Sequence, residues 1–360
     1  MRQETQPKGS RILRKVAATE GTECDAGRMA WQPRWAEKVG LMKVMDYVWP
    51  IIGLGAVVLS AWLLYQELRG ISFTDVIDSL AAIPAHNWLL AVAGAIVAYA
   101  ALAWYDRIAL LHLGRKIPWL FISIASFTTY ALSHNIGASV FSGAVVRYRA
   151  YSSRGLSASE IGVLVAFCSF TFLLGTLLLG ALVLIFDPYL VERLHKGTPL
   201  IVPVSIGLAM LALVATYVVG SWRGFKPLKI GSFAIHYPKT PVVIRQLLAA
   251  PVELMGAAAI IYFALPPDVG VSYFTVLGIF LASFSLALVS HAPGGLGVLE
   301  VVFVTAVPDL DKADVLAALI VFRLLYLLLP FAMSLVVVVL FERARFIGKT
   351  SGRLREKRQT

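Results

Sequence analysis

The sequence predicts an all-α integral membrane protein with eight hydrophobic segments. Of its 360 residues, 58% are hydrophobic and only 15% are charged, whereas soluble domains carry roughly 25% charged residues. The apolar residues form segments close to the ~20 residues that a helix needs to cross the hydrocarbon. The net charge of +11 gathers at the two ends of the chain, which is typical of segments that stay on the cytoplasmic side.

The basic residues divide the chain into three parts. We predict a basic cytoplasmic arm over residues 1–45, a polytopic membrane domain over residues 46–342 and a basic cytoplasmic tail over residues 343–360. Two cytoplasmic termini require an even number of crossings, and we expect them in the inner membrane of the cell. Clusters that flank apolar segments predict contact with anionic lipid rather than with nucleic acid.

The apolar segments are separated by short polar connections. They run over Val48–Gln66, Asn87–His112, Pro118–Asn135, Ile161–Phe186, Leu200–Trp222, Val242–Leu265, Val271–Ser290 and Val315–Phe341. Residues Ser72–Ile83 carry apolar side chains on one face, which predicts a short amphipathic helix at the interface. Arg223–Thr240 is polar and basic and is expected to be a cytoplasmic loop. Gly94, Gly175 and Gly180 favour close packing between helices.

Two stretches rich in small residues interrupt the helical pattern. The first is His134–Arg149, which includes Gly143, and the second is His291–Glu300. The second holds the strongest helix breakers of the chain, namely Pro293, Gly294, Gly295 and Gly297. Broken backbone at membrane depth survives only inside protein or beside a wet cavity, because lipid cannot satisfy the freed amides.

The positive charges after the first break suggest how the chain turns there. If the third segment turns back at the break, Arg147, Arg149 and Arg154 remain in the cytoplasm, and the same turn in the seventh segment keeps the tail inside. The result is six full transmembrane helices and two opposed re-entrant hairpins, arranged as an inverted repeat. Eight plain crossings are the alternative, since each arm is long enough to cross.

Ionisable residues inside the membrane domain are the candidate functional groups, because each costs about 2.5–3.5 kcal/mol near the bilayer centre on insertion scales. They are Asp106, Arg107, Arg147, Arg149, Arg245, Glu253, Glu300 and Arg323. The functional hypothesis is a polar cavity in which arginines hold an anionic phosphate. The structural alternative is ion pairing, of Asp106 with Arg107 or of Glu300 with Arg323. Arg107 also fits an interfacial anchor.

No motif in the chain indicates the chemistry of an enzyme. Cys24 and Cys168 lack metal-ligand spacing, and no disulfide between them is expected. The sequence contains no Gly-x-Ser-x-Gly elbow, no His-Glu-x-x-His pair and no Walker loop. We therefore predict no catalytic residue, no metal and no cofactor, and we interpret His134 and His291 as packing residues.

Several motifs recur in an order typical of one family. They are Tyr105-Asp106, Gly143 with Arg147-Tyr148-Arg149 and Gly155-Leu156, Glu253, Pro293-Gly294-Gly295-Leu296-Gly297-Val298-Leu299-Glu300, and Arg323-Leu324-Leu325-Tyr326 with Pro330. Over about residues 45–342 the chain resembles the transmembrane flippase domain of lysylphosphatidylglycerol synthase, the multiple peptide resistance factor, and its stand-alone membrane relatives. The Pro-Gly-Gly-Leu-Gly stretch that ends in Glu300 is the most specific part.

The resemblance implies a lipid flippase-like transporter that moves an anionic or aminoacylated phospholipid between leaflets. In this hypothesis Arg147 and Arg149 engage the phosphate. Asp106, Glu253 and Glu300 engage a cationic head group or couple to protons.

The remaining expected substrate-binding residues are Arg323, Tyr105 and Tyr326. In the family a separate soluble domain transfers the aminoacyl group. This chain ends soon after its last apolar segment, so it is expected to lack that domain and not to be an enzyme. The alternative hypothesis is a non-transporting membrane protein that binds lipid or assists an envelope enzyme. The identity of the lipid and the oligomeric state stay open.

Overall fold

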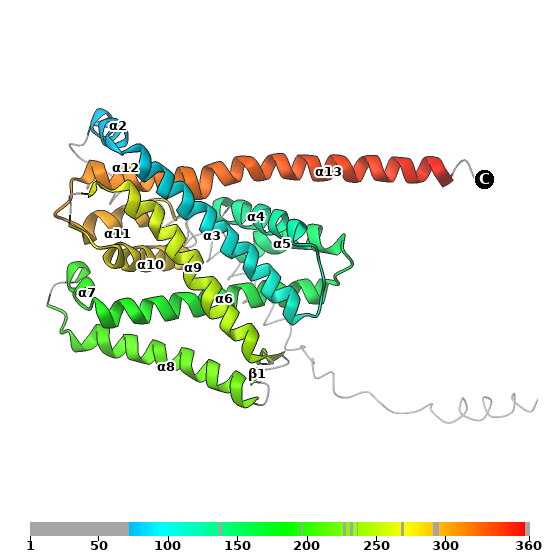
Figure 1. Ribbon diagram of the computed structural model, residues 1–360, viewed down its shortest axis with the longest axis horizontal. Helices are drawn as coiled ribbons and strands as arrows, with labels where there is room; N and C mark the ends of the chain where they lie inside the picture. Colours follow the sequence, from blue (N-terminus) through cyan, green and yellow to red (C-terminus); the bar gives the residue numbers. More distant parts are fainter. Residues whose placement is uncertain are drawn as a thin grey trace, which may run out of the picture. The chain divides into compact units, whose positions relative to one another are not determined.

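The computed structural model describes residues 72–356, except 137–138, 196, 226–227, 231–232, 236, 268–269 and 291–294. Apart from one small hairpin, the regular structure of this part of the chain is helical, as the composition predicts (Figure 1). The predicted arm over residues 1–45 and the first predicted segment, Val48–Gln66, lie outside the described residues, as do Pro293 and Gly294.

The elements follow one another with short connections. The helices are α2 (Phe73–Ala82), α3 (Ala85–His112), α4 (Trp119–Ile136), α5 (Ser139–Ser152), α6 (Ala158–Phe186), α7 (Tyr189–Leu194), α8 (Ile201–Arg223), α9 (Thr240–Ala264), α10 (Tyr273–Ser290), α11 (Val298–Ala306), α12 (Lys312–Phe322), the π-helix η3 (Arg323–Leu328) and α13 (Leu329–Glu356). Strands β1 (Leu228–Ile230) and β2 (Phe233–Ile235) pair antiparallel in the loop between α8 and α9.

Six helices are long and apolar enough to cross a membrane within the described residues. They span Ala85–His112, Ala158–Phe186, Ile201–Arg223, Thr240–Ala264, Tyr273–Ser290 and Lys312–Phe341. These correspond to the predicted segments two, four, five, six, seven and eight. The third predicted segment, α4, is helical but is not among the six, because serine, threonine, histidine and asparagine interrupt its apolar run.

The ends of two helices are set by side-chain caps. Ser157 and Glu160 form a reciprocal capping box at the start of α6, and Ser72 with Asp75 does the same at the start of α2. Such a box satisfies two backbone N–H groups that a helix start leaves free. The predicted amphipathic helix over Ser72–Ile83 is therefore confirmed as α2, with its start fixed by local sequence.

A helix ends within each predicted interruption, but the first was predicted too long, because α4 runs to Ile136 and α5 begins at Ser139, so most of His134–Arg149 is helical. The chain leaves α10 at Ser290 and re-enters helix at Val298, and Gly295 and Gly297 adopt left-handed φ values of 65° and 79°. The prediction of Gly143 as a break residue was wrong, because it lies inside α5. A Cβ atom at Gly143 would meet Thr129 of α4 at 3.4 Å, so this glycine permits close packing instead.

Among the helices that the structure describes, α3 and α9 share the most extensive contact and run side by side (Figure 1). A Cβ atom at Gly94 would lie 2.8 Å from the carbonyl oxygen of Gly256, and a Cβ at Gly256 would lie 2.8 Å from that of Gly94. Two glycines that face each other let the backbones touch, as in other membrane helix pairs. The predicted packing role of Gly94 is confirmed, and Gly175 of α6 packs against Ala250 of α9 in the same way.

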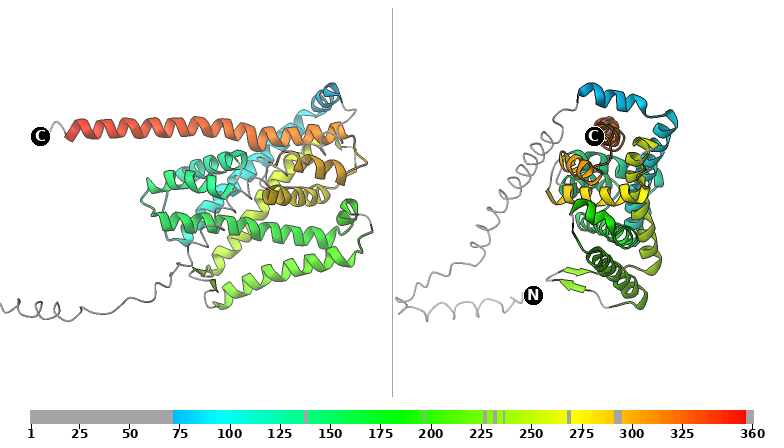
Figure 2. Two further views of the ribbon diagram at one scale, coloured as in Figure 1. Left: turned by 180° about the vertical axis from the view of Figure 1, so that it is seen from behind. Right: turned by 90° about the vertical axis from the view of Figure 1, so that its left-hand side faces the viewer.

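Two further pairs of helices flank this central pair. Helices α4 and α5 pack against each other, as do α10 and α11, and Figure 2 shows the two pairs near opposite ends of α3 and α9. Helix α11 has 9 residues, which at 1.5 Å per residue is roughly 14 Å and about half of the hydrocarbon thickness. Each pair thus consists of two helices joined at one of the predicted interruptions.

Candidate functional site

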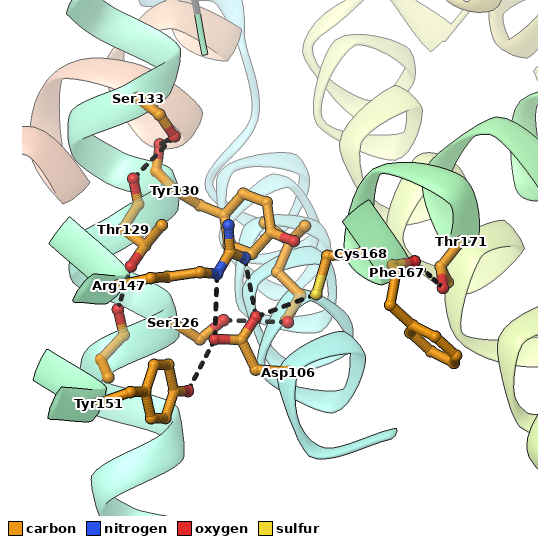
Figure 3. A network of polar contacts seen from close by, with 12 residues as sticks. Asp106, Ser126, Thr129, Tyr130, Ser133, Arg147, Tyr151, Phe167, Cys168 and Thr171 are labelled. Carbon is orange, nitrogen blue, oxygen red and sulfur yellow. Dashed lines mark hydrogen bonds and ion pairs between the residues drawn. The ribbon is translucent and has the colours of Figure 1, made fainter. Parts of the chain in front are cut away.

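Asp106 and Arg147 form a buried ion pair between α3 and α5 (Figure 3). The Arg147 Nη2 atom donates to Asp106 Oδ1 over 2.8 Å. Tyr151 donates its hydroxyl hydrogen to Oδ2 over 2.7 Å, and the Cys168 thiol lies 3.4 Å from Oδ1. Asp106 is 0% exposed and Arg147 is 4% exposed. The carboxylate is therefore held by one cation and two neutral donors, out of contact with solvent.

The local sequence explains how the arginine reaches this carboxylate. Arg147 and Tyr151 are four residues apart on α5, so their side chains share one face of the helix. The guanidinium of Arg147 also lies over the ring of Tyr130, 4.8 Å from its centroid, where the ring quadrupole attracts a cation. The pairing of Asp106 with Arg107 that we considered is not formed, and Arg107 lies over the ring of Trp119 instead.

Glu253 occupies the middle of α9 and is 2% exposed. Its Oε1 atom accepts a hydrogen bond from Tyr326 over 2.7 Å, and its Oε2 atom accepts one from Tyr105 over 3.3 Å. Among the residues that the structure describes, no basic side chain lies within ion-pairing distance of this carboxylate. Glu253 is thus a buried acid whose observed partners are two phenols.

Glu300 and Arg323 form the second ion pair, at the start of α11. The Arg323 Nε atom donates to Glu300 Oε1 over 2.7 Å, and Nη2 makes a second, shorter contact with the same oxygen. The other carboxylate oxygen accepts the backbone N–H of Gly297 over 2.9 Å, which caps the helix. Arg323 also reaches the carbonyl oxygen of Gly295. The Glu300–Arg323 ion pair, which belongs to the structural alternative, is formed, and it is tied to the backbone of the break.

The π-helix η3 is the place where both interruptions meet. Asn135, in the last turn of α4, donates to the carbonyl oxygen of Leu327 over 3.1 Å. The ring of His134 stacks on that of Tyr326 at a centroid distance of 5.4 Å. Arg323, the first residue of η3, contacts the second interruption as described above. A π-helical turn within an α-helix is rare and is often found at functional sites.

The structure brings together seven of the eight predicted substrate-binding residues in one connected set of contacts. Arg149 is the exception, because its side chain is exposed on α5. Four contributors were missed from the sequence, namely Tyr99, Tyr130, Tyr151 and Cys168. The local signals were the spacing of Tyr151 from Arg147 on α5 and that of Tyr99 from Asp106 on α3, seven residues apart on one helix face. Tyr130 and Cys168 approach the site from other helices. His134 packs among aromatic rings, as expected, although its buried Nδ1 atom has no hydrogen-bond partner in the described structure.

The donor set at this site shows no arrangement that would hold a metal ion. Within the described residues, no three histidine, cysteine, aspartate or glutamate side chains come close enough together to ligate one. The two arginines suit a different ligand, because a guanidinium binds the oxygens of a phosphate or carboxylate in a bidentate manner.

Comparison with known proteins identifies relatives over most of the chain. Residues 51–334 match the family model of the lysylphosphatidylglycerol synthase TM region. An uncharacterised Synechocystis protein, slr0712, is 32% identical over 283 residues, which is 78% of this chain and 87% of that protein. The inner membrane protein YbhN of Escherichia coli is 30% identical over 71% of this chain and 80% of its own length.

A third relative is much longer than the matched region. The phosphatidylglycerol lysyltransferase of Staphylococcus haemolyticus is 25% identical over 305 residues, which is 82% of this chain but 34% of that protein. The matched region is therefore found both within long lysyltransferases and in proteins that consist mostly of it.

Proposed function

Because the chain belongs to the family of lysylphosphatidylglycerol synthase TM regions, we propose that this multi-pass membrane protein moves a phospholipid head group between leaflets. The long Staphylococcus relatives are named for phosphatidylglycerol, so an anionic phospholipid, plain or aminoacylated, is the proposed substrate. The acyl tails remain in the bilayer while the head group passes through the protein.

In this proposal the two flanking helix pairs are re-entrant hairpins that enter from opposite faces of the membrane. The order α3, α4–α5, α6 is then repeated by α9, α10–α11 and α12–α13 with inverted topology, and both termini are cytoplasmic. Support comes from the positions of the two pairs at opposite ends of α3 and α9, and from α11, which is too short to cross alone. Each hairpin also contributes one member of an ion pair inside the membrane domain.

The observation that carries the proposal is the meeting of both interruptions at η3, which begins with Arg323. The buried Arg147 is linked to it through the rings of Tyr130 and His134. Charged groups in this position are costly unless they serve a pathway or a partner. A phosphate can replace the carboxylate on Arg147, because both anions present paired oxygens to the same guanidinium. Tyr151 and Cys168 would continue to donate to Asp106 during that exchange. Arg149, exposed on the same helix, would attract the head group first.

One observation favours the second candidate function, a lipid-binding protein that does not transport. Both arginines already have a carboxylate partner, and both Arg147 and Glu300 are buried. A site closed in this way also suits a protein that holds lipid or assists an envelope enzyme. Transport requires that the two ion pairs open one after the other, whereas lipid binding does not require either pair to open.

Transport is tested with the full chain in liposomes that contain fluorescent phosphatidylglycerol. A reductant that cannot cross the bilayer quenches only the outer leaflet, so translocation appears as additional quenching. Wild type is expected to translocate the lipid. Arg147→Ala and Glu253→Ala should be slower by roughly tenfold or more, since hydrogen bonds to charged groups contribute about 1.5–3 kcal/mol. Arg147→Lys keeps the charge but loses the bidentate geometry, so its translocation rate should lie between those of wild type and Arg147→Ala.

Arg115→Ala is the matched control for these variants. Arg115 pairs with Glu160 outside the site, and its side chain is 44% exposed. This variant should match wild type. Lipid that binds to the wild-type protein but is not translocated would establish the second function. Translocation that is unchanged in Arg147→Ala and Glu253→Ala would show that the site is wrong.

A further inference from the structure

We propose that Glu253 is a proton-binding site of the transporter, and that proton uptake there loosens η3 and the ion pair that η3 carries. The inference rests on the proposed transport function and assigns its coupling ion.

The charge balance of the site sets Glu253 apart from the other acids. Within the described residues, the connected contacts contain two arginines, Arg147 and Arg323, and three acids, Asp106, Glu253 and Glu300. Asp106 and Glu300 each have an arginine, so ionisation of all five groups leaves one uncompensated negative charge on Glu253. A lone charge in a low-dielectric interior is expensive, and uptake of one proton removes it.

The hydrogen bonds show what protonation would change. Tyr326 and Tyr105 both donate to the ionised carboxylate, one to each oxygen. A protonated carboxyl carries a hydrogen on one oxygen and must donate it. The hydrogen is expected on Oε2, because the hydrogen bond from Tyr105 to this oxygen, at 3.3 Å, is longer than the one from Tyr326 to Oε1. Tyr105 would then accept where it now donates, and the bond from Tyr326 to Oε1 would lose its ionic character and weaken.

The other titratable groups near Glu253 offer no competing charge. Its direct neighbours are Tyr99 and Tyr105 from α3 and Tyr326 from η3. Tyr130, His134 and Cys168 lie one contact further away, near Tyr105 or Tyr326. The phenols and the thiol are neutral near pH 7 in the absence of strong perturbation. His134 stacks on Tyr326, and its buried Nδ1 atom lacks a partner within the described residues. It offers a neighbouring position for a proton in transit from the first interruption.

Tyr326 connects the proton site to the rest of η3. Its backbone carbonyl oxygen accepts a hydrogen bond from Tyr99 over 2.9 Å. Three residues earlier on η3, Arg323 holds Glu300 and the carbonyl of Gly295. Weakening the side-chain bond of Tyr326 removes one of the restraints on this π-helical segment. Proton uptake at Glu253 would thus free Arg323 to leave Glu300 and meet a phosphate.

A lipid amine is the competing ligand for Glu253. An ammonium group needs room for its attached chain, whereas the carboxylate is 2% exposed and both of its oxygens face phenols. A proton requires no such room, so the geometry favours the proton.

The test is infrared difference spectroscopy of the full chain in liposomes of phosphatidylglycerol and phosphatidylethanolamine, titrated from alkaline to acidic pH. Wild type is expected to gain a carbonyl stretch of a protonated carboxyl, and Glu253→Gln should lack it. Glu192→Gln, which alters an exposed residue of α7, should keep it. In Tyr326→Phe the band should appear at higher pH, because the anion loses a donor. The absence of any Glu253-dependent band would overturn the proposal.

A transport arm on the same samples separates this inference from the function on which it rests. An imposed pH gradient should change the initial translocation rate of wild type severalfold and leave Glu253→Gln unaffected. Equal sensitivity of the two proteins, or a Glu253→Gln defect restricted to aminoacylated lipid, would overturn the proton site while translocation stands. A wild type that shows the Glu253 band but moves no lipid would contradict the transport function and, with it, the coupling.

Discussion

The two ion pairs of the site differ in what holds them. In the first, the side chains of Arg147 and Asp106 are 5% and 0% exposed, and helix side chains supply every other contact. In the second, the side chains of Arg323 and Glu300 are 15% and 10% exposed, and the backbone at Gly295 and Gly297 supplies further contacts. The first pair therefore fastens helices to each other, whereas the second fastens a turn of the chain.

This difference indicates that the two ion pairs have different structural roles within one site. A deeply buried pair held by side chains resists separation, because either partner alone would be left as an uncompensated charge. A pair that also caps a short helix controls the shape of the segment that it caps. We expect the first pair to dominate global stability and the second to dominate local opening.

The largest expected difference between the two pairs is in the free energy of unfolding after one partner is removed. Asp106→Ala leaves the guanidinium of Arg147 buried without its carboxylate and is expected to lower the free energy of unfolding by about 3–5 kcal/mol. Glu300→Ala should cost roughly half as much, since Arg323 is more exposed and keeps the carbonyl of Gly295. Thermal unfolding in detergent measures both. Equal losses, or a larger loss in Glu300→Ala, would contradict the comparison.

Amide hydrogen exchange near the second interruption should respond more to a change in the second pair than to a change in the first. Glu300→Gln weakens the cap on Gly297 and the bond to Arg323, so amide hydrogen exchange should quicken across Gly295–Val301 by roughly tenfold, for a loss of about 1.4 kcal/mol. Asp106→Asn, the matched change in the first pair, should leave exchange in this segment close to wild type. Faster exchange there in Asp106→Asn alone would show that the two pairs are not independent.

A further expected effect concerns a single neutral donor. Tyr151→Phe removes the hydroxyl that donates to Asp106 Oδ2 and leaves the ion pair in place. The free energy of unfolding should fall by about 1.5–3 kcal/mol if the carboxylate is ionised, and by about 1 kcal/mol if it is not. Denaturation in detergent distinguishes the two values. No change at all would mean that the carboxylate keeps this position without the phenol.

Much of this architecture could be predicted from sequence because its causes are local. Apolar segment length predicts the described spans, and the apolar face of Ser72–Ile83 predicts α2. The glycines at 295 and 297 predict where the chain leaves helix. The ion pair between Glu300 and Arg323 is suggested by the sequence because the two charges stand out in an apolar chain.

The rest of the site depends on how helices far apart in sequence are aligned. Asp106 meets Arg147 only because α5 folds back along α4, and the choice of Arg107 as its partner reflected sequence distance rather than space. Gly143 was placed at a break because small residues serve both turns and close packing, and the sequence does not separate the two. The phenols on Glu253 come from α3 and η3, so no spacing along the chain relates them to it.

The π-helical segment η3 also determines which face of α13 points toward the protein. A π turn holds one residue more than an α turn, so α13 is rotated by about 100° from where an uninterrupted α-helix would carry it. In this orientation Ser334 is buried, while Met333 and Val336 face outward. Loss of one residue between Arg323 and Leu328 would turn a hydroxyl toward the lipid and a different apolar face toward α4, although every amino acid of α13 would be unchanged.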